Sequence, residues 1–263
     1  MATQVLHGKI AIVSGAGGSI GAAVAKEFAA EGAEVFLAGH HPANVDAVVR
    51  QIAASGGKVH AARLDTLDEA AVDSYVDEVV NRAGKIDIVL DAAGPRAKEY
   101  GNGKNAVELP LEEFMVPLTT MVRSRFLTAR AVARHMVRQQ TGVIIFVTGS
   151  PARGHVPGAT AIGAAFGAME NLAENLAFEV SPLGVRVVCL RTLGNIDSRS
   201  IQETMEARNV PEDRRRALFA QSNFLRTVAT VKDTANAAVL IASDRARMLT
   251  GTVVNATAGA ALD

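Results

Sequence analysis

The sequence SGAGGSIG, at residues 14–21, contains the clearest indication of how this chain folds. Residues 10–13 before it form a β-branched run typical of a buried strand, and Ile20, Val24 and Phe28 recur at the spacing of one helix face. A glycine turn between a strand and a helix lets backbone N–H groups approach a pyrophosphate, which also meets the positive end of the helix dipole. The stretch therefore predicts a βαβ unit that binds a nucleotide.

The same alternation of short β-branched runs and longer amphipathic segments continues from Lys9 to the end of the chain. It predicts an α/β fold, a single doubly wound Rossmann-type parallel sheet of about seven strands with helices on both faces. Pro117 is expected to start or kink its helix. The predicted strands are 10–13, 35–38, 59–63, 86–90, 143–147, 185–190 and 253–255, and the clearest helices are 70–83, 118–140, 162–180 and 231–242.

Nothing in the sequence marks a domain boundary, since it contains no internal repeat, low-complexity tract or flexible linker. We therefore predict that residues 1–263 form one dinucleotide-binding domain. Residues 198–222 are charged and helical in pattern, and they interrupt the alternation before the last helix. They predict a helical insertion that acts as a lid, with a surface excursion of no function as the alternative.

Composition narrows the classes of partner. Hydrophobic residues make up 49% of the chain and aromatic residues only 4%, which predicts a core of small aliphatic side chains. Lys plus Arg and Asp plus Glu both number 27, so charge gives no argument for a nucleic-acid or membrane partner. The single cysteine, Cys189, excludes an intrachain disulfide, and no cluster of residues has metal-ligand spacing. No signal peptide or membrane-spanning run is evident, so a cytoplasmic location is expected.

The end of the second predicted strand bears on the choice of cofactor. In dinucleotide-binding folds an acidic residue about 20 residues beyond the glycine turn holds the ribose 2′-OH of NAD. Here Gly39, His40 and His41 offer no carboxylate, so nothing repels a 2′-phosphate, and His40 can approach one. NADP is slightly favoured over NAD, with a solvated histidine pair as the alternative interpretation.

Further motifs resemble those of the short-chain dehydrogenase/reductase family. LDT at 64–66, AAG at 92–94, GVIIFVTGS at 142–150 and TGTVVNATAG at 250–259 follow the glycine turn in the order and spacing of that family, across essentially the whole chain. The resemblance implies hydride transfer between a nicotinamide cofactor and a carbonyl or alcohol. It implies cofactor contacts, in addition to Gly39 and His40, at Ser14, Gly15, Ser19, Ile20, Gly21, Asp65, Ala93 and Gly94.

The catalytic residues of that family are an Asn, a Ser, a Tyr and a Lys. Its Tyr-x-x-x-Lys pair falls on Ile162 and Phe166 within PGATAIGAAFGAMENL, residues 157–172. The serine position falls on Gly149 and the asparagine position on Met121. Since the family uses tyrosine as acid or base, lysine to lower its pKa, serine to orient the substrate and asparagine to hold a water, we predict an atypical active site.

Another group must then supply the proton. Tyr100 follows the fourth strand, His155 lies in the loop RGHVPG, and Ser150 adjoins Gly149; each is a candidate donor, with an ordinary loop residue as the alternative. Asp91 either titrates in the cleft or braces its turn. Four basic residues nearby either receive an acidic substrate or, as we favour, lie on the surface: Arg96, Lys98, Arg123 and Arg125.

Three functions remain open. The first is a divergent oxidoreductase that binds NADP(H) or NAD(H) and holds a small, largely apolar carbonyl or alcohol against Ile162 and Phe166. The second is a redox-inactive binding or regulatory subunit, and the third is a non-redox isomerase or cyclase that uses the apolar cleft. The small residues around Gly163 and Gly167 permit close helix packing, either within the chain or in the dimers and tetramers that are common in the family.

Overall fold

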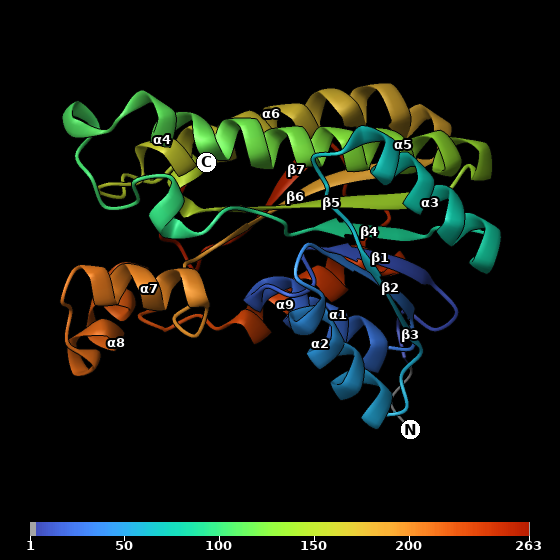
Figure 1. The fold of residues 1–263 in the computed structure, drawn as a ribbon, viewed down its shortest axis with the longest axis horizontal. Coiled ribbons are helices and arrows are strands. Elements are labelled where there is room, and N and C mark those ends of the chain that lie inside the picture. Colours follow the sequence, from blue (N-terminus) through green and yellow to red (C-terminus); the bar gives the residue numbers. More distant parts are fainter. Residues whose placement is uncertain (1–3, 263) are drawn as a thin grey trace.

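The computed structural model describes residues 4–262, in which seven parallel strands form one sheet of order β3-β2-β1-β4-β5-β6-β7 (Figure 1). This arrangement confirms the predicted doubly wound α/β fold. The β-branched runs form strands because both faces of the sheet are covered by helices. The strands are β1 (Ile10–Ser14), β2 (Glu34–Gly39), β3 (Val59–Arg63), β4 (Ile88–Asp91), β5 (Gly142–Gly149), β6 (Val185–Thr192) and β7 (Thr252–Ala256).

Helices cover the sheet in two layers, each over its own apolar core (Figure 1). One layer contains α1 (Ser19–Ala30), α2 (Pro42–Ala54) and α9 (Val231–Ala242). The other contains α3 (Glu69–Ala83), α5 (Arg123–Gln139) and α6 (Thr160–Val180). Cys189 is fully buried in β6, and burial raises the pKa of its thiol, as expected of an inert core residue.

The strand order reverses between β1 and β4, so their carboxyl ends flank the crevice in which doubly wound folds bind ligands. Ser14 at the end of β1 pairs with Asp91 at the end of β4, and Gly149 in β5 pairs with Thr192 in β6. The sheet register therefore brings residues from distant parts of the sequence to one edge.

The helix at Pro117 differs from the prediction, because it begins seven residues earlier, at Leu111 rather than 118. A π-helical turn (Leu118–Val122) joins α4 (Leu111–Pro117) to α5 without interruption. Proline removes one backbone donor, and the hydroxyls of Thr119 and Thr120 donate to the carbonyls of Met115 and Val116 at 2.9 and 2.6 Å. These side-chain bonds compete for carbonyls of the normal ladder and accompany the wider turn.

Residues 198–222 are helical, as the sequence predicts, and form α7 (Arg199–Ala207) and α8 (Glu212–Gln221). Both helices stand apart from the two main layers, beside the loop that follows β4 (Figure 1).

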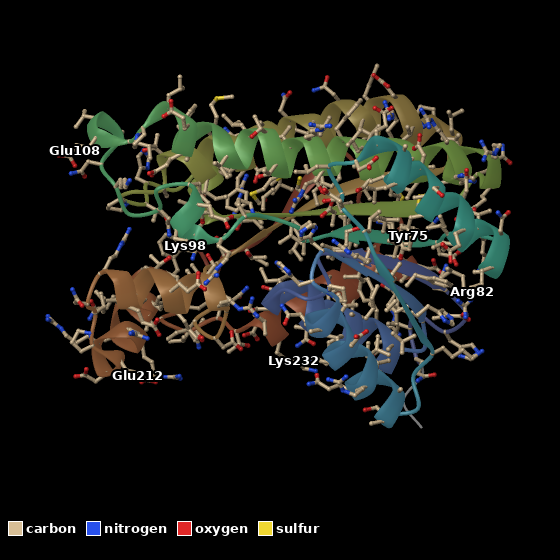
Figure 2. All side chains as sticks on the ribbon, viewed as in Figure 1. Tyr75, Arg82, Lys98, Glu108, Glu212 and Lys232 are labelled. Atoms are coloured by element: carbon tan, nitrogen blue, oxygen red, sulfur yellow. The ribbon has the colours of Figure 1, made fainter. Side chains whose placement is uncertain are left out.

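Tyr75 lies on α3, far from α7 and α8 and at the other end of the molecule from Lys98 and Glu108 (Figure 2). Within residues 4–262, no helix has the length and apolar character needed to cross a membrane.

Candidate functional site

Two hollows meet at the carboxyl edge of the sheet. The first, here called the glycine groove, has a volume of about 480 Å³ and runs past Gly15, Gly17 and Gly18. The second, the apolar cleft, has a volume of about 450 Å³ and lies between α6 and α7. Ala92, Gly94 and Pro95 line both hollows, so one elongated ligand could extend from the groove into the cleft.

The floor of the glycine groove is formed by backbone packed too closely for side chains. Gly15 has a φ of +73°, and a Cβ there would lie 2.5 Å from the amide nitrogen of Ala93. A Cβ on Gly21 would overlap the carbonyl oxygen of Gly15. Gly18 caps α1 without a side-chain hydrogen bond, so the amides of the first turn face the groove uncapped. This turn presents the positive end of α1 to a bound anion.

Most of the predicted cofactor-binding residues come together here. Gly15, Gly39, His40, Asp65, Ala93 and Gly94 line the groove, and Ile20 lines the cleft. Ser14 and Gly21 instead pack around the turn, while the Ser19 Oγ accepts a hydrogen bond from the Arg199 amide at 3.0 Å. The Asp65 carboxylate also accepts a bond from the Leu67 amide, at 2.9 Å.

The end of β4 is braced by a buried ion pair. Asp91 accepts hydrogen bonds from the amide of Ala93 at 2.8 Å and the hydroxyl of Ser124 at 2.9 Å. The Arg125 guanidinium donates to the carbonyl oxygens of Ala93 and Asp91 and lies 3.7 Å from the Asp91 carboxylate. Asp91 therefore braces its turn, one of the two predicted roles.

The expectation that Arg125 lies on the surface is wrong, because only 1% of its side chain is exposed. The guanidinium lies at the cleft, where two carbonyl groups and Asp91 compensate its buried charge. Burial lowers the pKa of Arg125, while the Asp91 charge acts in the opposite direction. Arg96, Lys98 and Arg123 are exposed, as expected.

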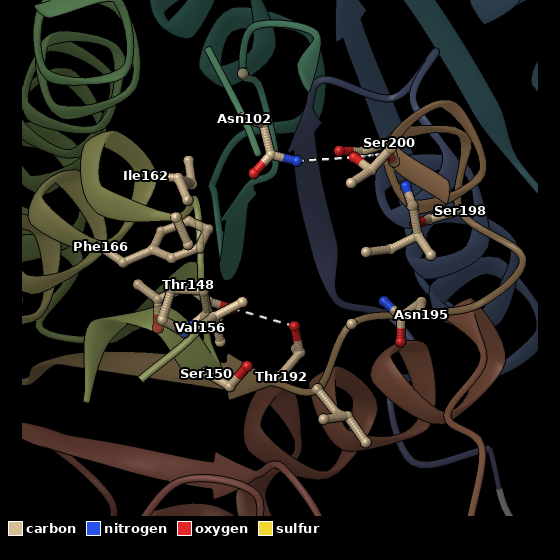
Figure 3. Close-up of a pocket in the computed structure, with 18 of the residues that line it drawn as sticks. Asn102, Thr148, Ser150, Val156, Ile162, Phe166, Thr192, Asn195, Ser198 and Ser200 are labelled. Carbon is tan, nitrogen blue, oxygen red and sulfur yellow. Dashed lines mark hydrogen bonds between the residues drawn. The ribbon is translucent and has the colours of Figure 1, made fainter. Parts of the chain in front are cut away.

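The four positions that the resemblance assigns to catalysis all line the apolar cleft. Ile162 and Phe166 project from α6 into it, facing Asn195, Ser198 and Ser200 across the opening (Figure 3). Met121 and Gly149 complete this wall. Four residues that the motif spacing grouped together thus line one cleft, although they lie on three different elements.

Gly149 and Phe166 fit together sterically. A Cβ on Gly149 would lie 2.8 Å from Cε2 of the Phe166 ring, closer than carbon atoms normally approach. The aromatic ring therefore occupies space that any larger residue at position 149 would need. The two residues form one packing unit, which the sequence alone did not reveal.

The candidate proton donors lie in different environments. Ser150 and Tyr100 are buried and line the cleft. Burial raises the pKa of the Tyr100 hydroxyl, while a hydrogen bond with Ser200 acts in the opposite direction. His155 is exposed and is not among the residues that line the cleft.

A second buried ion pair supports the cleft floor. The Arg191 guanidinium in β6 binds both carboxylate oxygens of Glu170 in α6 at 2.8 Å, and the Thr148 hydroxyl donates to the same carboxylate at 3.0 Å. Thr192 in turn donates to the Thr148 carbonyl at 3.1 Å. The prediction missed this pair, although charged residues within two largely apolar segments were a usable indication.

Helix α7 is fastened to the loop after β4. Arg96 forms a 2.5 Å ion pair with Glu203, and the Asn102 amide donates to the Thr204 hydroxyl at 2.8 Å. Arg208 donates to the carbonyl of Pro157 at 3.1 Å. Because Thr204 and Arg208 also line the cleft, α7 closes one side of it.

No group of His, Cys, Asp or Glu suited to a metal ion occurs among the residues that the structure describes.

A doubly wound parallel sheet with a glycine groove at its switch point defines the class of dinucleotide-binding α/β proteins. Within that class, the family model described as Enoyl-(Acyl carrier protein) reductase matches residues 15–261. The chain therefore belongs to the short-chain dehydrogenase/reductase family of oxidoreductases, as its motifs indicated.

Known relatives resemble the chain along nearly its whole length. The 7alpha-hydroxysteroid dehydrogenase of Escherichia coli K12 is 28% identical over 254 residues, which cover 97% of this chain and 94% of that protein. The 3-oxoacyl-[acyl-carrier-protein] reductase of Chlamydia pneumoniae is 28% identical over 245 residues, covering 93% and 94%. A 7α-hydroxysteroid dehydrogenase solved with NADH and 7-oxo glycochenodeoxycholic acid superposes with a TM-score of 0.86 at 26% identity, covering 99% and 97%.

Proposed function

We propose that the chain binds NADP(H) or NAD(H) in the glycine groove and holds a small, largely apolar carbonyl or alcohol in the apolar cleft. The observation that supports this most directly is that the two hollows share the lining residues Ala92, Gly94 and Pro95. A dinucleotide has one polar, anionic half and one reactive ring. The groove suits the first and the mouth of the cleft suits the second.

The residues of the groove fit the adenosine and pyrophosphate part of such a cofactor. The close approach of Gly15 to Ala93 leaves backbone in place of side chains, and the open first turn of α1 favours negative charge. Asp65, which the resemblance assigns to the adenine, lines the groove, and so do Gly39 and His40, to which we assign the adenosine ribose. A bound nicotinamide would supply or accept the hydride, while these residues bind and orient the molecule.

The cleft favours an apolar substrate with few polar anchors. Ile162, Phe166, Met121 and Val156 provide apolar surface, and the buried hydroxyl of Ser150 is available to a substrate oxygen. The tyrosine and lysine expected in the family are replaced here by side chains that transfer no proton. Ser150 and Tyr100 are therefore the proposed proton donors, directly or through water.

The Tyr100 hydroxyl is protonated at neutral pH, and burial raises its pKa further. It can donate a hydrogen bond there, but it is a poor base. The proposed role of Tyr100 is therefore to donate a hydrogen bond to the oxyanion that develops on the carbonyl oxygen during reduction.

Binding by calorimetry tests the first half of the proposal. We expect the purified chain to bind NADPH or NADH, with NADPH somewhat tighter because no carboxylate at the end of β2 repels the 2′-phosphate. Failure to bind either dinucleotide would contradict the proposal. A screen of apolar ketones with the dinucleotide that binds, followed at the nicotinamide absorbance, tests the second half.

A redox-inactive binding protein is the second candidate. It is supported by the resemblance, which assigns all four catalytic positions to the apolar or bare Met121, Gly149, Ile162 and Phe166, and by the fact that these four residues line one cleft. Tight dinucleotide binding with no turnover of any ketone or alcohol in the screen would support this candidate over the oxidoreductase.

A further inference from the structure

The phosphate end of the glycine groove is bordered by two helices rather than one. The first turn of α1 begins at Ser19, and the first turn of α7 begins at Arg199. The amide of Arg199 donates to the Ser19 Oγ at 3.0 Å, so the two helix beginnings are in direct contact. Both helix dipoles thus present their positive ends to the same region.

Arg199 is the first residue of α7 and stands at this junction. It lines the glycine groove together with Gly15, Gly17 and Gly18, although the residue belongs to the lid segment and is 180 positions away from Ser19. Among the described residues, its exposed guanidinium has no hydrogen bond or ion pair. The other arginine of the groove, Arg96, is already paired with Glu203.

Ser19 also has bonding capacity that its present contact does not use. A hydroxyl has one donor and two acceptor positions, and the Arg199 amide occupies only an acceptor position. Within residues 4–262 the Ser19 hydroxyl donates to no acceptor. Ser19 is not itself among the residues that line the groove, but it is partly exposed and adjoins Gly18, which does line it. Ser19 stands where the family usually has glycine, which offers no such group.

The acidic side chains in and beside the groove already have hydrogen-bond partners. Glu99 accepts a bond from the Arg96 amide at 2.9 Å, and Asp65 binds the Leu67 amide beyond the end of β3. Asp197, the nearest acidic residue along the chain, accepts a bond from the Val231 amide at 2.9 Å. Each of these carboxylates is therefore engaged by backbone N–H groups.

We propose that Arg199 and the Ser19 hydroxyl form an additional pyrophosphate-binding pair, in which the lid segment supplies the cation for the dinucleotide. Planar guanidinium matches phosphate oxygens in a bidentate manner and is the preferred partner for them. This inference rests on the proposed function. It adds that the lid contributes to cofactor affinity and is not only a wall of the substrate cleft.

Calorimetry on the full chain tests the pair without any turnover. We expect Arg199→Gln to weaken NADH, NADPH and ADP-ribose by about 10-fold each, because one charge-assisted contact is lost. The matched control is Arg214→Gln, since Arg214 is equally exposed on the neighbouring helix and lines neither hollow. It should leave all three affinities unchanged.

The pattern of losses separates the possible outcomes. Equal weakening of NADH and NADPH places the guanidinium on the pyrophosphate that both contain. A loss confined to NADPH would assign Arg199 to the 2′-phosphate and overturn the proposal, as would unchanged binding by Arg199→Gln. In both cases wild-type binding would leave the proposed function intact, whereas a wild-type chain that binds no dinucleotide would overturn both.

Ser19→Ala provides the second measurement. It should weaken ADP-ribose by roughly 3-fold to 10-fold and raise amide hydrogen exchange at the start of α7, because the Arg199 amide loses its acceptor. If exchange rises while affinity stays constant, the serine serves only to hold the lid. That result would remove it from the proposed pair.

Discussion

The glycine groove and the apolar cleft adjoin along one edge of the same sheet, yet they are built from different parts of the chain. The groove is mainly a backbone structure, in which Gly15 and Gly21 permit close approach and the first turn of α1 has no side-chain cap. The cleft is a side-chain structure, in which Ile162 and Phe166 form the wall. A backbone site survives most substitutions, whereas a side-chain site changes its chemistry with each one. Under the proposed function, this contrast would allow the groove to keep binding the cofactor while the chemistry of the cleft changes.

The strongest way to break this contrast is to restore the side chains of the cleft. The triple variant Ile162→Tyr, Phe166→Lys, Gly149→Ser should gain ketone reductase activity with NADPH of at least about 100-fold over wild type, the lower range for general acid–base catalysis. The nicotinamide absorbance measures it. Removal of the Phe166 ring also frees the space that the new serine needs. A folded triple variant that still binds NADPH but shows no gain would mean that the backbone around the cleft has diverged too.

The charged cleft floor gives the next largest effect. Arg191→Met should lower the free energy of unfolding by about 3–5 kcal/mol, because it leaves the Glu170 carboxylate buried without its main partner. Chemical denaturation measures the loss. The control is Glu170→Gln combined with Arg191→Met, which removes both charges and should recover part of the stability. If the single and double variants lose equal free energy of unfolding, the packing of these side chains, and not their charge, determines the stability of the cleft floor.

A smaller effect tests the fit between Gly149 and Phe166. Gly149→Ser alone should cost about 1–3 kcal/mol of stability, since its Cβ would lie 2.8 Å from the ring. Adding Phe166→Leu should relieve the contact, so the two substitutions should couple favourably in a double-mutant cycle. Additive losses would argue that the loop after β5 moves to accommodate the serine.

The smallest expected effect is a change in the preference of the glycine groove for NADPH over NADH. His40→Asp should weaken NADPH and leave NADH unchanged or tighter, shifting their ratio by about 10-fold, because a carboxylate repels the 2′-phosphate and can accept from the ribose hydroxyl. Calorimetry with both dinucleotides measures the shift. His41→Asn, one residue further along the same rim, is the control. An unchanged ratio would mean that the ribose lies away from the end of β2.

The sequence was sufficient for features that depend on local patterns. Alternating strands and helices predicted the sheet, and the spacing of the motifs brought Met121, Gly149, Ile162 and Phe166 to one cleft. The sequence-based prediction was wrong where the burial of a residue depends on partners that are distant in the chain. Arg125 lies in a charged, amphipathic segment typical of a surface, and only the turn after β4, 32 residues earlier, makes its burial possible. The steric exclusion between Gly149 and Phe166 likewise depends on a loop that no pattern describes.

The π-helical turn at Leu118–Val122 also has a consequence for how mutations along this helix should be interpreted. Such a turn contains one residue more than the α-helix that surrounds it, so the helical phase before and after it differs by about 100°. Met121 faces the cleft from within that turn. Deleting Thr120 would restore a regular helix and rotate α4 relative to α5 by that angle. One deleted residue would therefore change which side chains of Leu111–Pro117 face the protein, without any substitution in that segment.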